Sequence, residues 1–225
     1  MSKTRYLTEK RILQTIVVTA LLILAVEALA YYALFSSIPG FMDKYLMYII
    51  YLDISIVATM ITLWHLSGYR DMVTHMSGMM IGMTTGMISA FSIGALVGAT
   101  NGMFVGSVVG IFVGMPIGAY AGKCCGIMGV MEGLMAGLMA GTMGPMISVM
   151  MLNDNIALFL PLLIGSGLLI MGGLTYMMHK EEMLQRLPQK YVSSDYLSFV
   201  TVCFVVALVV TFIMAYGPRS LLFAA

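Results

Sequence analysis

The segment from Gly78 to Gly144 reads GMMIGMTTGMISAFSIGALVGATNGMFVGSVVGIFVGMPIGAYAGKCCGIMGVMEGLMAGLMAGTMG, and it decides how the chain folds. Small residues recur at every fourth position, in one phase and then in a second that is shifted by one residue. The first phase holds Gly78, Gly82, Gly86, Ala90, Gly94, Gly98, Gly102, Gly106, Gly110, Gly114, Gly118, Gly122 and Gly126, and the second holds Gly129, Gly133, Gly137 and Gly141. Residues four apart lie nearly above one another on an α-helix, so each run forms a groove without side chains. In lipid, such grooves let helix backbones approach closely. The segment therefore predicts tightly packed membrane helices.

The composition is that of an integral membrane protein. Of the 225 residues, 60% are hydrophobic and 9% are charged, and the mean hydropathy is +0.99. Soluble domains carry roughly 25% charged residues. A net charge of +1 gives no basic surface for nucleic acid, so no nucleic-acid partner is expected. We expect a single integral membrane domain over residues 1–225, surrounded by the lipid bilayer.

Seven apolar segments are long enough to cross a bilayer, which takes about 20 residues. They cover residues 12–35, 45–68, 72–97, 102–121, 127–152, 156–178 and 196–216. The sequence thus predicts an all-α polytopic membrane protein of about seven transmembrane helices. The glycine-rich third, fourth and fifth spans are expected to form a central glycine-zipper (GxxxG) helix cluster. The connections between them are very short, which predicts antiparallel neighbours.

The distribution of Lys and Arg predicts the orientation, because cytoplasmic loops carry an excess of both. With the N-terminus inside, only Lys44 and Arg219 among the 11 cations face outward. We therefore predict a multi-pass protein of the cell membrane with a cytoplasmic N-terminus and an external C-terminus. The turn at residues 123–125 then lies at the cytoplasmic face.

Methionine is unusually common, with 25 copies. In the fifth span, methionines follow glycines by two residues, which is about 200° around a helix, so they lie opposite the glycine face. Thioethers are soft ligands that suit Cu(I), so these ladders predict a route for a soft metal cation, with a copper ion as the metal expected. The alternative is that flexible methionines fill irregular gaps between helices. The candidate ligands on the ladders are Met79, Met83, Met87, Met131, Met135, Met139 and Met143.

The MxxxM pattern combined with GxxxG packing resembles the Ctr-type copper permeases. The residues that carry the resemblance are Met79 with Met83 and Met131 with Met135, together with the repeated GxxxG spacing. In that family an MxxxM helix lines the pore and a GxxxG helix packs nearby. This chain differs in having seven predicted spans, where the family has three, and it lacks a Met-rich soluble N-terminus. The resemblance implies an analogous mechanism, and we infer no membership from it.

Cys124 and Cys125 lie beside Lys123 in a predicted turn. A positive charge near a thiol favours the thiolate, which is the form that binds metal ions. The pair is a candidate exit or acceptor site for a soft ion, and the alternative is two small residues in a tight turn. His75 is a further candidate ligand, because its spacing from Met79 places both on one helix face. The alternative for His75 is an ordinary interfacial histidine.

Three acidic residues fall within predicted spans: Glu27, Asp53 and Glu132. A charge at the centre of a bilayer costs about 2.5 to 3.5 kcal/mol on insertion scales, so such residues face a cavity or a partner. All three are candidates for a cation or proton pathway. For Glu132 we favour a simpler interpretation, an ion pair with Lys123.

The favoured function is a small membrane transporter or channel for a soft metal cation, Cu(I) above all. The alternative is a non-catalytic scaffold or accessory subunit that packs through its glycine-zipper helices, in a homo-oligomer or a larger membrane complex. A third interpretation is a pore that opens under membrane tension. The sequence contains no HExxH, GxSxG or Walker A motif, so no enzymatic activity is expected.

Overall fold

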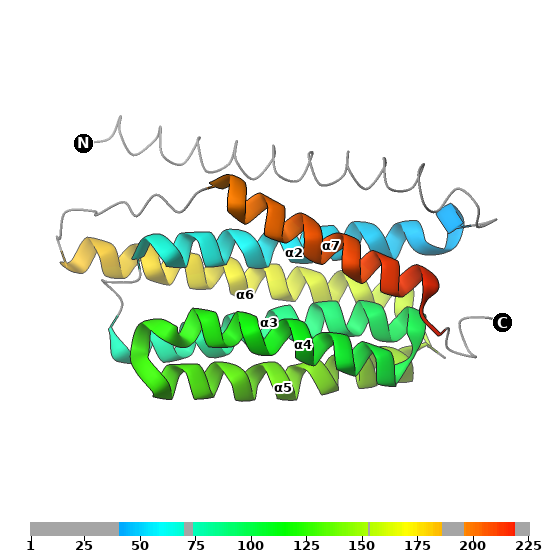
Figure 1. The fold of residues 1–225 in the computed structure, drawn as a ribbon, viewed down its shortest axis with the longest axis horizontal. Coiled ribbons are helices and arrows are strands. Elements are labelled where there is room, and N and C mark those ends of the chain that lie inside the picture. Colours follow the sequence, from blue (N-terminus) through cyan, green and yellow to red (C-terminus); the bar gives the residue numbers. More distant parts are fainter. Residues whose placement is uncertain (1–40, 70–73, 153, 186–195, 219–225) are drawn as a thin grey trace.

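The computed structural model of the chain describes residues 41–69, 74–152, 154–185 and 196–218. Regular structure within these ranges is entirely helical, and the long helices run side by side (Figure 1). The elements are α2 (Phe41–Tyr69), α3 (His75–Asn101), α4 (Met103–Gly122), the 3-10 helix η2 (Lys123–Cys125), α5 (Gly126–Met151), α6 (Ile156–Gln185) and α7 (Tyr196–Tyr216). Each helix covers one predicted segment, and α6 continues past residue 178. The predicted span at residues 12–35 lies outside the described residues.

Four segments of the described residues are long and apolar enough to cross a membrane. They are Tyr45–Leu66, His75–Asn101, Met103–Met151 and Ile156–Met178. The third segment is 49 residues long and contains the whole of α4, η2 and α5. The described apolar part of α7, Phe204–Tyr216, is shorter. The described chain is therefore all-helical and compatible with a membrane-embedded protein, with four candidate spanning segments.

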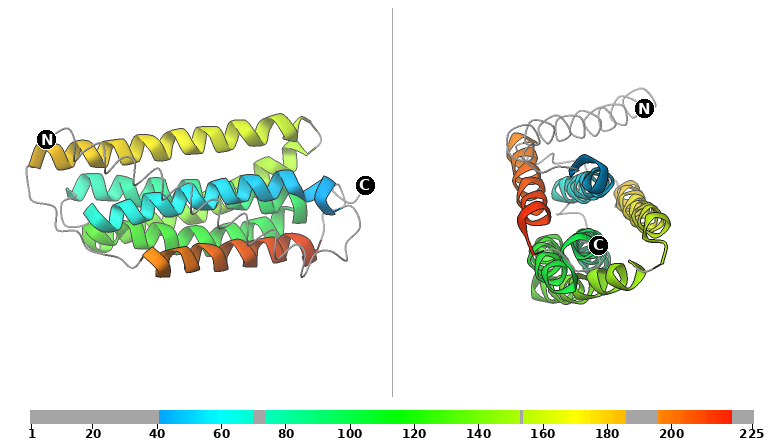
Figure 2. Two further views of the ribbon diagram at one scale, coloured as in Figure 1. Left: turned by 90° about the horizontal axis from the view of Figure 1, so that it is seen from above. Right: turned by 90° about the vertical axis from the view of Figure 1, so that its right-hand side faces the viewer.

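The helices form a tight group of three and a looser group around it. α3, α4 and α5 pack closely against one another, and α2 contacts both α6 and α7. Figure 2 shows the three green helices gathered on one side, with α2 between the yellow α6 and the orange α7. α3 is the central element, because it also contacts α2, α6 and α7.

Glycine backbones make the contacts within the group of three. A Cβ atom added to Gly86 would lie 2.8 Å from Cα of Gly118 in α4 and 3.1 Å from the carbonyl oxygen of Gly133 in α5. Further along the bundle, a Cβ on Gly110 would lie 2.9 Å from Cα of Gly141. Real Cβ atoms essentially never come within 3.0 Å of such an atom, and 3.1 Å is tighter than most of their contacts. Any larger residue at these places would push the helices apart.

Polar side chains on α3 are buried without leaving their hydroxyl groups unpaired. Thr85 Oγ1 donates a hydrogen bond to the carbonyl oxygen of Ile81 at 2.7 Å, and Ser89 Oγ donates to that of Thr85 at 2.8 Å. Both hydroxyl-bearing side chains are fully buried. Bonds to the preceding turn let a small hydroxyl residue pack at a helix contact without the cost of an unpaired polar group.

Asn101 ties the end of α3 to α7. Its Nδ2 donates a hydrogen bond to the carbonyl oxygen of Ile213 at 3.1 Å, and its Oδ1 accepts one from Thr100 Oγ1 at 2.7 Å. Gly102 follows with a φ of 92°, a conformation that favours glycine, and α4 begins at the next residue. This corner reverses the chain and anchors the last helix.

Candidate functional site

The methionine ladder of α5 lies on the outside of the glycine-packed group. Met131, Met135, Met139 and Met143 are between 51% and 63% exposed. The glycines two residues before them face inward: Gly133 and Gly137 meet the backbone of α4. The thioethers therefore point away from the axis shared by α3, α4 and α5, which is filled by backbone.

The ladder of α3 is also turned outward. Met83 and Met87 are exposed and Met79 is half-buried, although most of the same helix is buried. Gly86 lies between Met83 and Met87 and approaches Gly133 of α5. The two ladders consequently flank the same level of the bundle, each on its own exposed surface.

A groove of about 530 Å³ lies along the outer surface of α4 and α5. It falls within the usual range of ligand clefts, about 300 to 1,000 Å³. Its walls hold four thioethers, one carboxylate and two aliphatic side chains, namely Met115, Met128, Met131, Glu132, Leu134, Met135 and Leu138. This groove is the place in the described chain where several predicted ligands meet.

Two of the groove methionines, Met115 and Met128, were missed by the sequence reasoning. Met128 lies three residues before Met131 on the same helix, so helical periodicity could have placed both on one face. Met115 comes from α4 and joins the groove only because the hairpin folds back. No local pattern in the sequence indicates that contact.

Glu132 lines the groove and is half-buried. The ion pair with Lys123 that the sequence favours is not formed between these two described residues, and Lys123 is exposed. The carboxylate instead stands among thioethers and leucines. A cation in the groove would meet one negative charge in otherwise apolar surroundings.

The cysteine pair lies at the turn of the α4–α5 hairpin. The Sγ atoms of Cys124 and Cys125 are 3.7 Å apart, and Cys125 is buried. Cys125 Sγ lies 3.7 Å from the carbonyl oxygen of Thr74, the residue that precedes α3. His75 is the next residue and is exposed. The fold thus brings the cysteine turn to the start of α3, a long-range neighbour that the sequence did not predict.

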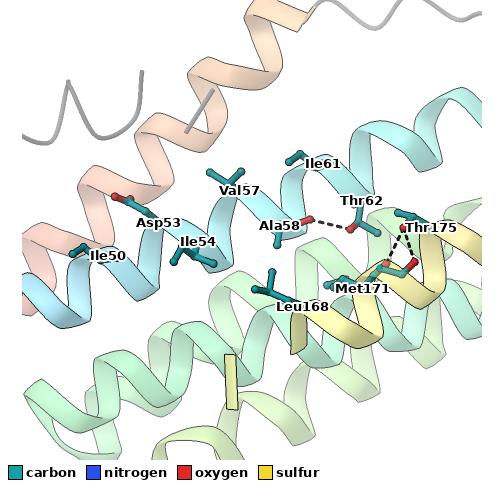
Figure 3. Close-up of a pocket in the computed structure, with 11 residues that line it drawn as sticks. Ile50, Asp53, Ile54, Val57, Ala58, Ile61, Thr62, Leu168, Met171 and Thr175 are labelled. Atoms are coloured by element: carbon teal, nitrogen blue, oxygen red, sulfur yellow. Dashed lines mark hydrogen bonds between the residues drawn. The ribbon is translucent and has the colours of Figure 1, made fainter. Parts of the chain in front are cut away.

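Asp53 belongs to a separate place, a pocket of about 480 Å³ between α2 and α6. Its side chain is 5% exposed. Figure 3 shows Asp53 toward one end of the row of lining residues and Thr62 and Thr175 toward the other. Thr62 and Thr175 donate hydrogen bonds to carbonyl oxygens of their own helices. Asp53 is the one ionisable residue among those that line this pocket.

The predicted site residues therefore fall into separate groups. Met131, Glu132 and Met135 share the α4–α5 groove, whereas Met139 and Met143 lie farther along α5. The cysteine pair lies at the hairpin turn, and Asp53 is among the residues that line a different pocket. Glu27 lies outside the described residues. Within those residues, no group of three or more His, Cys, Asp and Glu side chains is arranged to hold a metal ion.

Comparison with protein-family models, with curated proteins and with solved structures gives no match to this chain.

Proposed function

We propose that this chain is a small membrane transporter or channel for a soft metal cation, Cu(I) above all. The observation that supports it is the α4–α5 groove, in which four thioethers surround a single carboxylate. Thioether sulfur binds soft ions in preference to Mg²⁺ or Ca²⁺. The class proposed is transport, and no catalytic step is assigned.

The groove suits a monovalent ion by charge as well as by ligand type. Burying an isolated charge in apolar surroundings is costly unless it is paired. The Glu132 carboxylate offsets one positive charge, and the methionines supply neutral ligands around it. Because methionine side chains have several rotatable bonds, the sulfur atoms can follow an ion along the groove.

The proposed topology has seven spans. Segment 12–35 is the first, and α4 and α5 are two antiparallel spans within the long apolar segment Met103–Met151. The close backbone contacts of α3, α4 and α5 support a glycine-zipper cluster at the centre. The bias of Lys and Arg supports a cytoplasmic N-terminus and an external C-terminus.

The test is Cu(I) binding by the purified protein in mild detergent under reducing conditions. The double variant Met131→Leu/Met135→Leu removes two groove ligands at nearly constant volume. The matched control is Met146→Leu/Met150→Leu, two exposed methionines of the same helix that do not line the groove. We expect Cu(I) affinity to fall by at least about tenfold in the groove variant only, equivalent to about 1.4 kcal/mol. Equal affinities in all three proteins would contradict the proposal.

A non-transporting scaffold or accessory subunit is the second candidate, because part of the apolar surface of α6 is not covered by the other described residues. Gly165 and Gly173 of α6 have no atom within 4 Å of an added Cβ. Open small-residue positions in a membrane helix suit contact with another helix. Under this alternative, Met→Leu changes leave all activity intact, while bulky residues on α6 release a partner protein or a second copy.

A further inference from the structure

The turn between α4 and α5 holds two thiols side by side. η2 spans Lys123–Cys125, and Gly126 has a φ of 73°, so the chain reverses within a few residues. The two Sγ atoms of Cys124 and Cys125 are 3.7 Å apart. Beside them lies the carbonyl oxygen of Thr74, 3.7 Å from Cys125 Sγ. Two soft sulfur atoms and one oxygen atom thus gather at one end of the glycine-packed helices.

The separation of the sulfur atoms matches one edge of a metal coordination sphere. With metal–sulfur bonds of about 2.3 Å and an S–metal–S angle of about 109°, two thiolate ligands lie about 3.8 Å apart. The pair has nearly this separation without any side-chain rearrangement. Those values describe a tetrahedral ion; a two-coordinate ion with its sulfur ligands opposite each other needs the sulfur atoms about 4.6 Å apart, so the two thiols would have to separate by about 0.9 Å on binding.

The backbone disfavours the competing product, a disulfide within the pair. Consecutive Cα atoms are about 3.8 Å apart across a trans peptide bond. Disulfides normally need a Cα–Cα distance of about 4.4 Å or more. Oxidation of Cys124 with Cys125 would therefore strain the turn, and the reduced dithiol is the favoured form.

We propose that Cys124 and Cys125 form a two-thiolate site for a soft monovalent cation, Cu(I) or Ag(I). This deepens the proposed function, on which it rests for passage of the ion across the bilayer. On binding, two S–H bonds break, both protons pass to water, and two metal–sulfur bonds form with no change of oxidation state. The resulting unit has one net negative charge, and the exposed Lys123 beside it supplies a positive one.

The site is suited to transfer of an ion. Among the described residues, no third His, Cys, Asp or Glu side chain joins the two cysteines in a metal-binding group. Closed four-ligand sites are typical of structural zinc, whereas an open site can exchange its ion with another thiol. Cys124 is partly exposed, so an incoming ligand would approach from its side. Met128 of the groove follows Cys125 by three residues in the sequence.

The experiment is an anaerobic Cu(I) titration of the full-length protein in detergent, against a chromophoric Cu(I) chelator and without added thiols. The double variant Cys124→Ser/Cys125→Ser removes both sulfurs. The matched control is Cys203→Ser, which changes the remaining cysteine of the sequence. Thermal melting of each protein checks that the fold is kept. X-ray absorption then gives the number and length of the copper–sulfur bonds.

We expect the wild type and Cys203→Ser to bind one more Cu(I) than the double variant, or to bind it at least about 100-fold more tightly. Loss of an outer partner alone typically costs 10- to 100-fold in metal affinity. Ag(I) should also protect the partly exposed Cys124 from alkylation by a maleimide, as read by peptide mass spectrometry. Unchanged stoichiometry and affinity in the double variant would overturn the inference. So would an intact disulfide between the two cysteines in anaerobically purified protein.

The two proposals fail in different ways. The groove variant Met131→Leu/Met135→Leu should keep the short copper–thiolate bonds while losing the weaker groove binding. If the thiolate signal is present and the groove variant behaves as the wild type, the transport proposal fails and the dithiol site stands. If the thiolate signal is absent and groove binding is lost as expected, only the dithiol inference fails.

Discussion

Glu132 is the one ionisable side chain among the residues that line the α4–α5 groove. Its surroundings are thioethers and aliphatic groups, which do not compensate a negative charge. A carboxylate in such a position is costly in the absence of a cation. We interpret Glu132 as the residue that sets the charge preference of the groove, while Met131 and Met135 set its preference for soft ions.

The change Glu132→Gln separates these two roles. It keeps the shape and removes the charge, so Cu(I) affinity should fall by about tenfold, or about 1.4 kcal/mol. In the absence of metal, the melting temperature should stay the same or rise, because a costly charge is removed. Chelator competition and thermal melting on the same preparations measure both quantities. A fall in melting temperature with unchanged affinity would show that the carboxylate is structural.

At the scale of the helices, the effect of a glycine on the stability of α3, α4 and α5 depends on where it lies. Gly86 and Gly165 are both helical glycines, but only Gly86 meets other backbones closely. Alanine is the better helix former by about 1 kcal/mol. Replacing a glycine with alanine therefore stabilises the protein only where the added methyl group has room.

The pair of variants Gly86→Ala and Gly165→Ala tests this directly. Gly86→Ala should destabilise the protein by about 1 to 3 kcal/mol, because its Cβ would overlap α4 and α5. Gly165→Ala, with no atom within 4 Å, should be neutral or stabilising. Thermal melting in one detergent gives the comparison. Equal destabilisation by both variants would contradict the close helix contacts.

The buried side-chain amide of Asn101 links α3 to α7 by a hydrogen bond. Replacing Asn101 with Ala removes the hydrogen bond to the Ile213 carbonyl oxygen and leaves Thr100 Oγ1 without its side-chain acceptor. A loss of about 1 to 3 kcal/mol is expected. Hydrogen exchange should quicken at the C-terminal end of α7 more than in α5. The control is Asn155→Ala, at the exposed start of α6, which should leave hydrogen exchange at the C-terminal end of α7 unchanged.

For the whole molecule, hydropathy and glycine spacing predict the helices well. Predicted span 127–152 compares with α5 at Gly126–Met151, and 196–216 coincides with α7. Long apolar runs ended by short polar turns carry that information locally. The number of spans is harder to predict than the bounds of the helices, because α4 and α5 join into one apolar segment across a three-residue turn.

The site was only partly predictable, because its formation depends on contacts between helices. Helical spacing places Met131 and Met135 on one face, but it does not say that this face is exposed. Met115 joins the groove through the α4–α5 hairpin, and Cys125 lies against Thr74 at one end of the glycine-packed helices. Such neighbours come from tertiary packing and leave no periodic signal in the sequence.

The proposed orientation also belongs to the scale of the whole molecule. Cys124, placed inside by the Lys and Arg bias, should react with a membrane-impermeant maleimide only after cells are permeabilised. A cysteine introduced by Asp154→Cys, in the exposed turn between α5 and α6, should react in intact cells. A Cys203→Ser background removes the third thiol. Labelling of Cys124 in intact cells, with the introduced cysteine at position 154 reacting only after permeabilisation, would show the opposite orientation.

The proposed transport function requires that the methionine groove carry a soft cation across a membrane. The most direct measurement is Cu(I) uptake into proteoliposomes loaded with a Cu(I)-sensitive dye. The proteins to compare are the wild type, Met131→Leu/Met135→Leu and the control Met146→Leu/Met150→Leu. We expect uptake by the wild type and the control, and at least about a tenfold lower rate in the groove variant, since two ligands are lost. Uptake that is no faster than in empty liposomes, or that is equal in all three proteins, would contradict it.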